Sequence, residues 1–301
     1  MGKDFGRIGV LMGGPSAERE ISLRSGKAVL EALLIKGYDA KPIEVYMPTK
    51  EELKSLDIDA AFIALHGSFG EDGQLQSMLE ELNIPYTGSG IQASRLAMNK
   101  IVSREIFKIN RLSVPKYEVL KNGANLNLKF EMPIVVKPSA QGSSVGLTIV
   151  DREGELKGAL DRAFEFGEEI LVEEYIEGKE ITVGILEDRP LPVIQIVPKR
   201  RFYDYVAKYT AGVTEYLVPA PISKIEFESA QETGLRAHKS LGCRSFSRVD
   251  MILNKDGVPV ILEVNTIPGL TQLSLLPKAA EMAGIKFPEL CERMLESVLQ
   301  K

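Results

Sequence analysis

Two carboxylates and one amide near the end of this chain have the residue types and the spacing of a metal site. Two apolar runs flank Asp256-Gly257, a dipeptide that favours a two-residue β-hairpin turn. Counting outward from that turn places Asp250 directly opposite Glu263, with Asn265 on the same face. Facing carboxylates repel each other, and a cation between them removes the repulsion. An all-oxygen set of Asp, Glu and Asn suits Mg²⁺, which takes its other ligands from water and substrate phosphates.

An ordinary solvent-exposed hairpin face is the alternative interpretation of the same residues. Four large apolar residues, Ile252, Leu253, Ile261 and Leu262, predict instead a strand pair that is buried on both sides. Buried carboxylates without a partner are rare. We therefore favour the metal site over the exposed face.

A loop in the middle of the chain has the composition of a phosphate-binding segment. Residues 134–136 predict a strand that ends at Lys137, and residues 139–147 then read as a loop of small, flexible residues. Such a loop exposes backbone N–H groups that fold over phosphates, and Lys137 would add a positive charge. A flexible hairpin loop is an equally good interpretation of this segment alone. Two strands follow, over 170–176 and 180–186; Glu180, which begins the second, is either a ligand for a ribose diol or an edge-strand charge.

Strands and helices alternate at the start of the chain. Apolar patterns predict strands over 7–12, 40–45 and 60–65, and a helix that starts at Ser16 as its N-cap and runs to residue 34. This alternation builds a parallel sheet with ligands at the carboxyl ends of its strands. Glu18 and His66 follow two of those ends. Taken alone, they would be a helix-capping carboxylate and a loop histidine.

The remaining segments predict helices over 93–107, with Lys100 on it, and over 225–241, and a helix pair over 277–299. Residues 200–216 have no clear period. They read either as a loop that holds Lys208 and Tyr209 near a polar ligand or as a surface loop with packed aromatics.

Composition limits the function classes. The 301 residues are 44% hydrophobic and 26% charged, which is typical of a globular protein of two or three domains. A net charge of −5 and the lack of a long basic run argue against nucleic-acid binding. Two distant cysteines form no disulfide framework, and no stretch reads as a signal peptide or a membrane span. We expect a cytoplasmic protein.

A flexible Gly/Ser loop, several lysines and an acidic hairpin together predict an ATP site with Mg²⁺ that lacks a P-loop. Five motifs, in the same order along the chain, match a known family. They are residues 13–20 (GGPSAERE), 66–73 (HGSFGEDG), 137–138 with 142–146 (KP and GSSVG), 205–209 (YVAKY) and 262–266 with 268–271 (LEVNT and PGLT). On these motifs the chain resembles the D-alanine–D-alanine ligases of the ATP-grasp superfamily over nearly its whole length.

The resemblance implies an α/β (α+β) chain: an ATP-grasp fold with an N-terminal Rossmann-like (preATP-grasp) α/β domain. The implied domains are 1–95, which binds the first substrate, 96–177, the central ATP-grasp subdomain, and 178–301, with the metal and second-substrate sites. The implied reaction joins two D-alanines through an acylphosphate, for peptidoglycan precursor synthesis. ATP and two Mg²⁺ ions are implied, with Mn²⁺ as a substitute and a monovalent cation as an option, as is a homodimer.

The family's functional residues carry over by motif. Nucleotide would be bound by Lys100, Lys137, Ser144, Glu173, Glu174, Ile176, Glu180 and Lys208, and the metal ions by Asp250, Glu263 and Asn265. The substrates would be bound by Glu18, His66, Arg248, Gly269, Ser274 and Leu275. The catalytic group would be Glu18, Ser143, Tyr209 and Arg248, and Tyr209 favours the dipeptide over an ester product.

One departure and two rival functions accompany the resemblance. Residues 139–142 read SAQG, where many relatives carry Arg-Glu before the glycine, so we expect altered loop closure with the chemistry retained. The rivals are another ATP-grasp carboxylate–amine ligase and a nucleotide-binding regulator without turnover. Glu18 and His66 argue against the first, and the intact acidic hairpin with Arg248 argues against the second.

Overall fold

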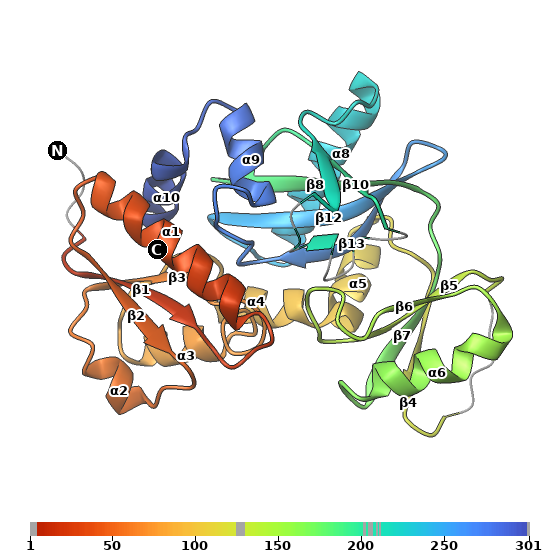
Figure 1. The fold of residues 1–301 in the computed structure, drawn as a ribbon, viewed down its shortest axis with the longest axis horizontal. Helices are drawn as coiled ribbons and strands as arrows, with labels where there is room; N and C mark the ends of the chain where they lie inside the picture. The colour runs from red at the N-terminus through yellow and green to blue at the C-terminus, as the bar shows by residue number, and fades with distance from the viewer. Residues whose placement is uncertain are drawn as a thin grey trace.

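The computed structural model describes residues 5–124, 130–200, 203, 207, 208, 210 and 212–299. Its strands form three sheets, arranged in Figure 1 with the parallel sheet at the left, the largest sheet in the centre and a smaller antiparallel sheet at the right. Helices and strands are both abundant along the chain, so the expected α/β class is confirmed.

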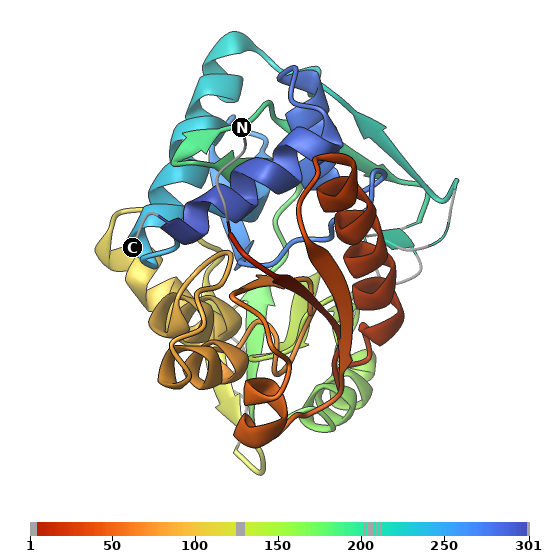
Figure 2. The same ribbon diagram turned by 90° about the vertical axis from the view of Figure 1, so that its left-hand side faces the viewer.

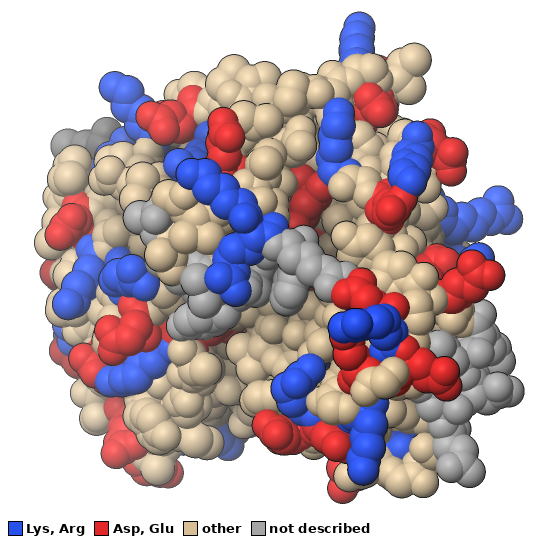
Figure 3. Space-filling model, turned by 45° about the vertical axis from the view of Figure 1, so that its right-hand side comes forward, with Lys and Arg blue, Asp and Glu red and all other residues tan. Residues whose placement is uncertain are grey.

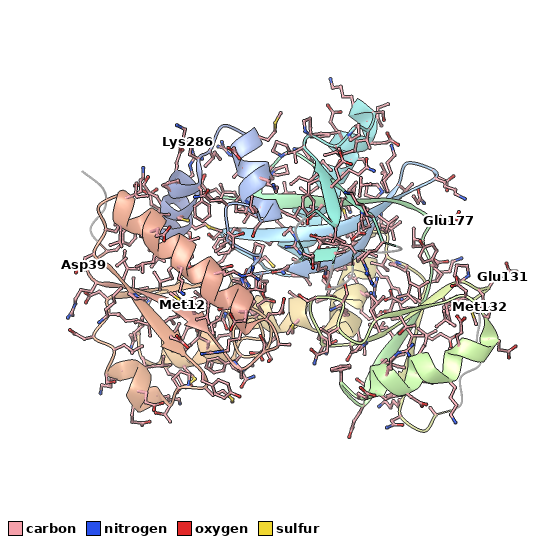
Figure 4. All side chains as sticks on the ribbon, in the orientation of Figure 1. Met12, Asp39, Glu131, Met132, Glu177 and Lys286 are labelled. Atoms are coloured by element: carbon pink, nitrogen blue, oxygen red, sulfur yellow. The ribbon has the colours of Figure 1, made fainter. Side chains whose placement is uncertain are left out.

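The first sheet is parallel, with strand order β2-β1-β3. Its elements are β1 (Ile8–Gly13), α1 (Arg19–Ile35), β2 (Ala40–Val45), α2 (Lys50–Lys54), β3 (Ala60–Ile63) and α3 (Gln74–Glu81). Every residue of β1 is buried, as a central strand covered by helices requires. Helix α1 packs closely on β1, because a Cβ added at Gly26 would lie 2.5 Å from Cβ of Met12, which Figure 4 labels.

The start of α1 differs from the prediction. Glu18 occupies the N-cap position, so the expected N-cap at Ser16 is wrong. Ser16 Oγ instead donates to the His66 carbonyl at 2.6 Å and accepts from the Glu18 N–H at 3.2 Å. The hydroxyl therefore ties the loop after β1 to the loop after β3.

Two helices stand where one was expected over 93–107. They are α4 (Ile91–Met98) and α5 (Lys100–Ile109), separated by Asn99 in an extended conformation. The Asn99 side-chain oxygen accepts from the N–H groups of Ile101 at 3.0 Å and Val102 at 3.1 Å, which caps α5. The break places Lys100 at the first position of α5.

The four-stranded sheet is antiparallel, with strand order β4-β7-β5-β6. It comprises β4 (Tyr117–Lys121), β5 (Ile134–Pro138), β6 (Thr148–Val150) and β7 (Glu169–Glu174), covered by α6 (Glu153–Phe164). Small residues of α6 pack on the strands in a core of its own, made of Leu120, Ile134, Val136, Val150, Ala159, Ala163, Ile170 and Val172. Its link to the next sheet passes through Glu177, which lies at the right of Figure 4.

The six-stranded sheet has the order β11-β10-β8-β12-β13, with β9 paired to β8. Its elements are β8 (Gly178–Leu186), β9 (Arg189–Pro190), β10 (Ile194–Pro198), β11 (Thr214–Leu217), β12 (Phe246–Asn254) and β13 (Pro259–Asn265). Helix α8 (Lys224–Ser240) packs Gly234 against Val183, and α9 (Leu275–Met282) packs Leu276 against Gly184. Because successive strand residues point to opposite faces, the two helices cover opposite faces of the sheet.

One hydrophobic core joins the start of the chain to its last helices. It contains Phe5, Val10 and Val29 together with Leu276 of α9 and Met294 of α10 (Phe287–Glu296), which continues into η1 (Ser297–Leu299). Figure 2 shows α10 alongside α1. The parallel sheet and the six-stranded sheet are therefore fastened to each other by buried apolar contacts.

The turn of the β12–β13 hairpin is longer than expected. The last pair of the hairpin is Leu253 with Pro259, and β12 extends one residue further, to Asn254. Residues 255–258 therefore form the connection, and the expected two-residue turn at Asp256-Gly257 is wrong. The Asn254 side chain stabilises this longer turn by accepting from the N–H groups of Asp256 at 3.0 Å and Val258 at 2.8 Å.

Asp250 nevertheless lies opposite Glu263, as expected. Met251 pairs with Ile261 and Asp250 with Glu263, so Leu262 is an extra residue in β13. This bulge shifts the register by one residue and cancels the shift introduced by the turn.

Candidate active site

A cavity of about 420 Å³ lies between the four-stranded and six-stranded sheets. All the residues expected to bind nucleotide line it: Lys100, Lys137, Ser144, Glu173, Glu174, Ile176, Glu180 and Lys208. Apolar residues of both sheets, among them Val135 of β5, Ile196 of β10 and Leu262 of β13, complete the lining. Apolar walls with a few placed cations suit a ligand that has a flat base and a charged tail.

A buried ion pair connects the two strands at the centre of the four-stranded sheet. Lys137 Nζ, at the end of β5, lies 2.9 Å from Glu173 Oε2 of β7. Burial lowers the pKa of Lys137 to about 8, although the charge of Glu173 opposes that shift. Lys137 is therefore mostly protonated at neutral pH, but its pKa lies only about one unit above that pH.

Lys100 joins the first turn of α5 to the hairpin. Its Nζ lies 3.2 Å from Glu263 Oε2 and donates to the Gln141 carbonyl at 2.7 Å. Burial alone would raise the pKa of Glu263, but Lys100, Lys208 and Lys137 together hold it well below its ordinary value. The Glu263 side chain is therefore a carboxylate at neutral pH.

Glu180 lies on β8 in the same cavity. Burial raises the pKa of its carboxyl group to about 7, and the charge of Lys208 opposes the shift. Lys208 Nζ also lies 5.3 Å from the centre of the Tyr203 ring, within cation–π range. With a pKa near neutral, the Glu180 carboxyl group can accept or donate a hydrogen bond, which suits a polar ligand such as a diol.

Arg248 and Asp250 are bound to each other on β12. Arg248 donates from Nε to Asp250 Oδ1 at 2.9 Å and from Nη2 to Oδ2 at 2.7 Å, and Thr182 Oγ1 donates to Oδ1 at 2.6 Å. Burial alone would lower the pKa of Arg248, but the Asp250 charge raises it above its usual range. The Arg248 guanidinium group therefore stays charged although it is buried.

The oxygen ligands expected to hold metal ions share one face of the hairpin. Asp250 pairs with Glu263, and Asn265 pairs with Arg248 two residues along the ladder. Among the described residues no three His, Cys, Asp or Glu side chains form a metal cluster, and this set contains only two carboxylates and an amide. Such a set fits Mg²⁺, because that ion keeps several waters and takes its other ligands from substrate phosphates.

A second cavity, of about 430 Å³, is lined by all the described residues expected to bind the amino-acid substrates or to act in catalysis. They are Glu18, His66, Ser143, Arg248, Gly269, Ser274 and Leu275. Lys100, Tyr203, Lys208 and Glu263 line both cavities, so the two cavities adjoin. Tyr209 lies outside the described residues.

Glu18 contacts the Gly/Ser loop across the second cavity. Ser143 Oγ donates a hydrogen bond to Glu18 Oε1, and a Cβ at Gly142 would lie 3.1 Å from Glu18 Oε2. Ser143 and Ser144 have φ values of 50° and 59°, a backbone conformation that residues other than glycine adopt only at a cost in free energy. The loop thus comes close to Glu18 with two consecutive residues in the left-handed region.

His66 is held from both sides of its ring. Nδ1 lies 2.9 Å from the Ile267 carbonyl and Nε2 lies 3.0 Å from Ser25 Oγ. Glu71 Oε1 lies 3.5 Å from Nδ1, and burial raises the pKa of Glu71 to about 7. Burial alone would lower the pKa of His66, but Glu71 raises it, so a cationic imidazole is favoured beside the carboxylates.

Ser274 stands at the N-cap of α9. Its hydroxyl accepts from the Thr271 N–H at 3.1 Å and lies 2.9 Å from Thr271 Oγ1, and a Cβ at Gly269 would lie 3.0 Å from it. The first N–H groups of a helix have no partner within the helix, so this end suits a carboxylate.

Two residues of the site were not assigned from the sequence. Glu71 lies inside the recognised segment 66–73, and its burial beside His66 depends on the fold of that loop. Arg104 Nη2 lies 2.6 Å from Glu173 Oε1, and its position one helical turn after Lys100 was the only available signal.

One face of the molecule carries charges of both signs. On the face drawn in Figure 3, Lys and Arg are interspersed with Asp and Glu, so that face does not have the basic patch of a nucleic-acid groove. Within the described part of the chain, no helix has both the length and the apolar character needed to cross a bilayer.

Two protein-family models match the sequence. One, described as the D-ala D-ala ligase C-terminus, covers residues 107–296, and the other, described as the D-ala D-ala ligase N-terminus, covers residues 44–89. Together they include the four-stranded and six-stranded sheets and part of the parallel sheet.

Relatives and solved structures agree with this match. D-alanine–D-alanine ligases from Geotalea uraniireducens and Geobacter sulfurreducens are each 50% identical, over 98% and 97% of this chain and 96% and 93% of theirs. A crystal structure of the Bacillus anthracis ligase complexed with ATP has a TM-score of 0.87 at 38% identity, covering 99% of this chain and 98% of that one. VanG D-Ala:D-Ser ligase from Enterococcus faecalis has a TM-score of 0.85 at 30% identity, covering 98% and 100%. The resemblance inferred from the motifs is thereby confirmed, and the chain belongs to the D-alanine–D-alanine ligase family.

Proposed function

We propose that this chain joins two D-alanines into D-alanyl-D-alanine at the expense of ATP, as a step in peptidoglycan precursor synthesis. The observation that carries the proposal is the junction of the two cavities at Lys100, Lys208 and Glu263. A nucleotide in the first cavity and an amino acid in the second would meet at this cationic junction, where a phosphoryl group can pass between them.

In the first step a carboxylate oxygen of one D-alanine attacks the γ-phosphorus of ATP. A C–O–P linkage forms, the bond between the γ-phosphorus and the bridging oxygen breaks, and ADP leaves. Lys100, Lys137 and Lys208 neutralise the phosphate charges, while Glu18 holds the ammonium group of this D-alanine. Arg248, at the wall of the second cavity, stabilises the transferring phosphoryl group.

In the second step the amine of the other D-alanine attacks the acyl carbon. The tetrahedral oxyanion is stabilised by Arg248 and the Gly269 N–H, and the C–O bond to phosphate then breaks as the nitrogen loses its proton. Ser274 and the Leu275 N–H, at the start of α9, bind the second carboxylate. Water would hydrolyse the acylphosphate, so the site must exclude it. The hydrogen bond from Ser143 to Glu18 would hold the Gly/Ser loop closed over the site.

Asp250, Glu263 and Asn265 would hold the magnesium ions, with manganese as a substitute. Bound there, such ions neutralise phosphate charge and polarise the transferred group. Arg248 and Lys100 form ion pairs with Asp250 and Glu263, and the lowered pKa of Glu263 keeps that carboxylate ionised and able to bind a cation. ATP itself would place its base between the sheets near Glu174 and Ile176, with its ribose on Glu180.

A D-alanine–D-serine ligase is the second candidate, because VanG is similar over the whole chain at 30% identity. Phosphate release with Mg·ATP and D-alanine, followed by mass analysis of the product, tests the proposal. Parallel reactions contain D-serine or D-lactate as competing acceptors. No release with D-alanine, or a mixed product in equal competition, would contradict it.

Tyr209→Phe should shift the product toward the ester with D-lactate, since Tyr209 matches the residue found in dipeptide-forming relatives.

We further propose a homodimer, to be checked by light scattering, and a cytoplasmic location. Cys243 and Cys291 are both buried free thiols, which agrees with a reducing compartment. The boundaries 1–95, 96–177 and 178–301 are proposed as the functional divisions of the chain, and limited proteolysis would test them. Burial of α10 against α1 predicts that the first and last of these parts stay together after cleavage.

A further inference from the structure

Arg104 is a buried charge that none of the steps above uses. It belongs to α5 and is only 1% exposed, the largest side chain among the fully buried ones. A guanidinium group is seldom so buried unless several acceptors hold it. Its acceptors therefore show what the chain gains from placing it there.

The acceptors of Arg104 lie on two different sheets. Nη1 donates to the Ile261 carbonyl at 3.3 Å and Nη2 to the Leu262 carbonyl at 3.4 Å, both on β13. Nη2 also lies 2.6 Å from Glu173 Oε1 on β7. The guanidinium group thus bridges the six-stranded and the four-stranded sheets at the nucleotide cavity.

Both ends of this bridge lead directly to residues of the reaction. Leu262 is the bulge residue that places Glu263 opposite Asp250, so Arg104 binds the backbone immediately before a metal-binding carboxylate. At the other end, Glu173 Oε2 lies 2.9 Å from Lys137 Nζ. A continuous series of contacts therefore runs from Glu263 through Arg104 and Glu173 to Lys137.

Lys100 makes a second connection one helical turn earlier. It contacts Glu263 on the hairpin and the Gln141 carbonyl in the Gly/Ser loop. Residues four apart in a helix lie on the same face, so Lys100 and Arg104 act from one side of α5. Helix α5 thereby spans the two walls of the cavity with two cations.

We propose that Arg104 is a positioning residue for the ligation reaction, which fixes Glu263 relative to Lys137 by binding the bulged strand and Glu173 at once. The inference rests on the proposed ATP-dependent function. It predicts that loss of Arg104 misplaces the groups around the ATP phosphates but leaves the D-alanine pocket around Glu18 intact. A purely structural role would lower stability without that selectivity.

The decisive variant is Arg104→Met in the full chain, analysed with ATP and D-alanine varied separately. The KM for ATP should rise about 10- to 100-fold, the range found when partners that orient ligand groups are removed. The KM for the first D-alanine should stay near its original value. Arg104→Lys keeps the charge but not the forked guanidinium group that reaches both sheets. Its KM for ATP should therefore lie between those of the unmodified chain and Arg104→Met. Lys108→Met, which removes an exposed cation from the next turn of α5, is the matched control and should change neither constant.

Coupling to Glu173 separates positioning from general destabilisation. Arg104→Met and Glu173→Gln interrupt the same series of contacts, so the double variant should be little worse than the worse single variant. Additive losses, or an Arg104→Met enzyme with a lower melting temperature and an unchanged KM for ATP, would overturn the proposal. If Arg104→Met does not fold, Arg104→Lys takes its place in the same cycle.

The affinity for a fluorescent ATP analogue gives a readout that is independent of ligation. It should fall in Arg104→Met by a factor similar to the rise in KM, and unchanged affinity would count against the proposal. If the unmodified chain releases no phosphate with D-alanine, the proposed function fails, and this affinity alone decides the role of Arg104.

Discussion

Lys100 Nζ lies 3.2 Å from Glu263 Oε2 where the two cavities adjoin. This contact links the first turn of α5 to β13, which carries part of the face proposed to bind metal ions. Because three lysines hold the pKa of Glu263 low, a negative charge persists at the junction. A cation can therefore be bound there without first removing a proton.

Glu263→Gln should lower turnover by about 100-fold or more, since the amide keeps the shape but loses the charge that we propose binds a metal ion. Circular dichroism should show an intact fold. Phosphate release at saturating Mg·ATP and D-alanine measures the effect. Asp256→Asn, an exposed carboxylate in the turn of the same hairpin, is the control. Near-normal turnover of Glu263→Gln would contradict the metal assignment.

The kcat/KM for ATP should fall as the pH rises above about 8, because the pKa of Lys137 is lowered to about 8 and its charge is lost above that pH. The sign follows from a cation that must be protonated to bind phosphate. Lys137→Arg should move the alkaline limb upward, since arginine stays charged. An unchanged limb in that variant would assign it to another group.

Ser143→Ala should raise the KM for D-alanine about 10-fold, the usual effect of removing a hydrogen bond to a charged group. The reason is that Ser143 donates to Glu18, the expected ligand of the D-alanine ammonium group. The KM for ATP should change little. Ser139→Ala serves as control, because Ser139 contacts Lys100 through its backbone carbonyl. Equal effects on both KM values would argue for loop unfolding.

His238 should make the fold less stable in mild acid. It is fully buried, with Nδ1 2.7 Å from Ser247 Oγ, and burial lowers its pKa to about 4. As the pH falls from about 6.5 to about 4, the unfolded chain binds a proton that the folded chain does not. The free energy of unfolding therefore decreases by up to about 3 kcal/mol over that range.

Urea unfolding of the unmodified chain and of His238→Gln, at pH 7 and pH 5, measures the difference. The variant should lose less stability on acidification. His66, the only other histidine, has a raised pKa and contributes with the opposite sign, so only the difference between the two proteins isolates His238. Parallel pH dependences would refute the assignment.

The strands of the parallel sheet were predictable from the sequence because their apolar patterns are local. β11 was not, because it begins at Thr214, inside the aperiodic segment 200–216 that was expected to be a loop. The apolar run of β1 and the alternation through β3 gave a parallel sheet, which the structure contains. The break at Asn99 was missed, since apolar periodicity continues across it and only the cap reveals the boundary. Asp250 was placed opposite Glu263 although the turn was wrong, because the bulge at Leu262 restored the register.

The candidate site was predictable where a motif carried it. Every described residue to which the resemblance assigned a role lines one of the two cavities, although the individual roles stay predictions. Arg104 and Glu71 could not be assigned in the same way. Their importance depends on partners more than 50 residues away or on burial, neither of which a local pattern encodes.

The core shared by α1 and α10 has a consequence for synthesis on the ribosome. Phe5 and Val29 are made early, but Met294 and Val298, which cover the same core, are made some 260 residues later. The four-stranded sheet, by contrast, has its own core within residues 120–172 and can fold as soon as it emerges. The middle of the chain should therefore become protease-resistant before α1 does, because the core beneath α1 is completed only by α10.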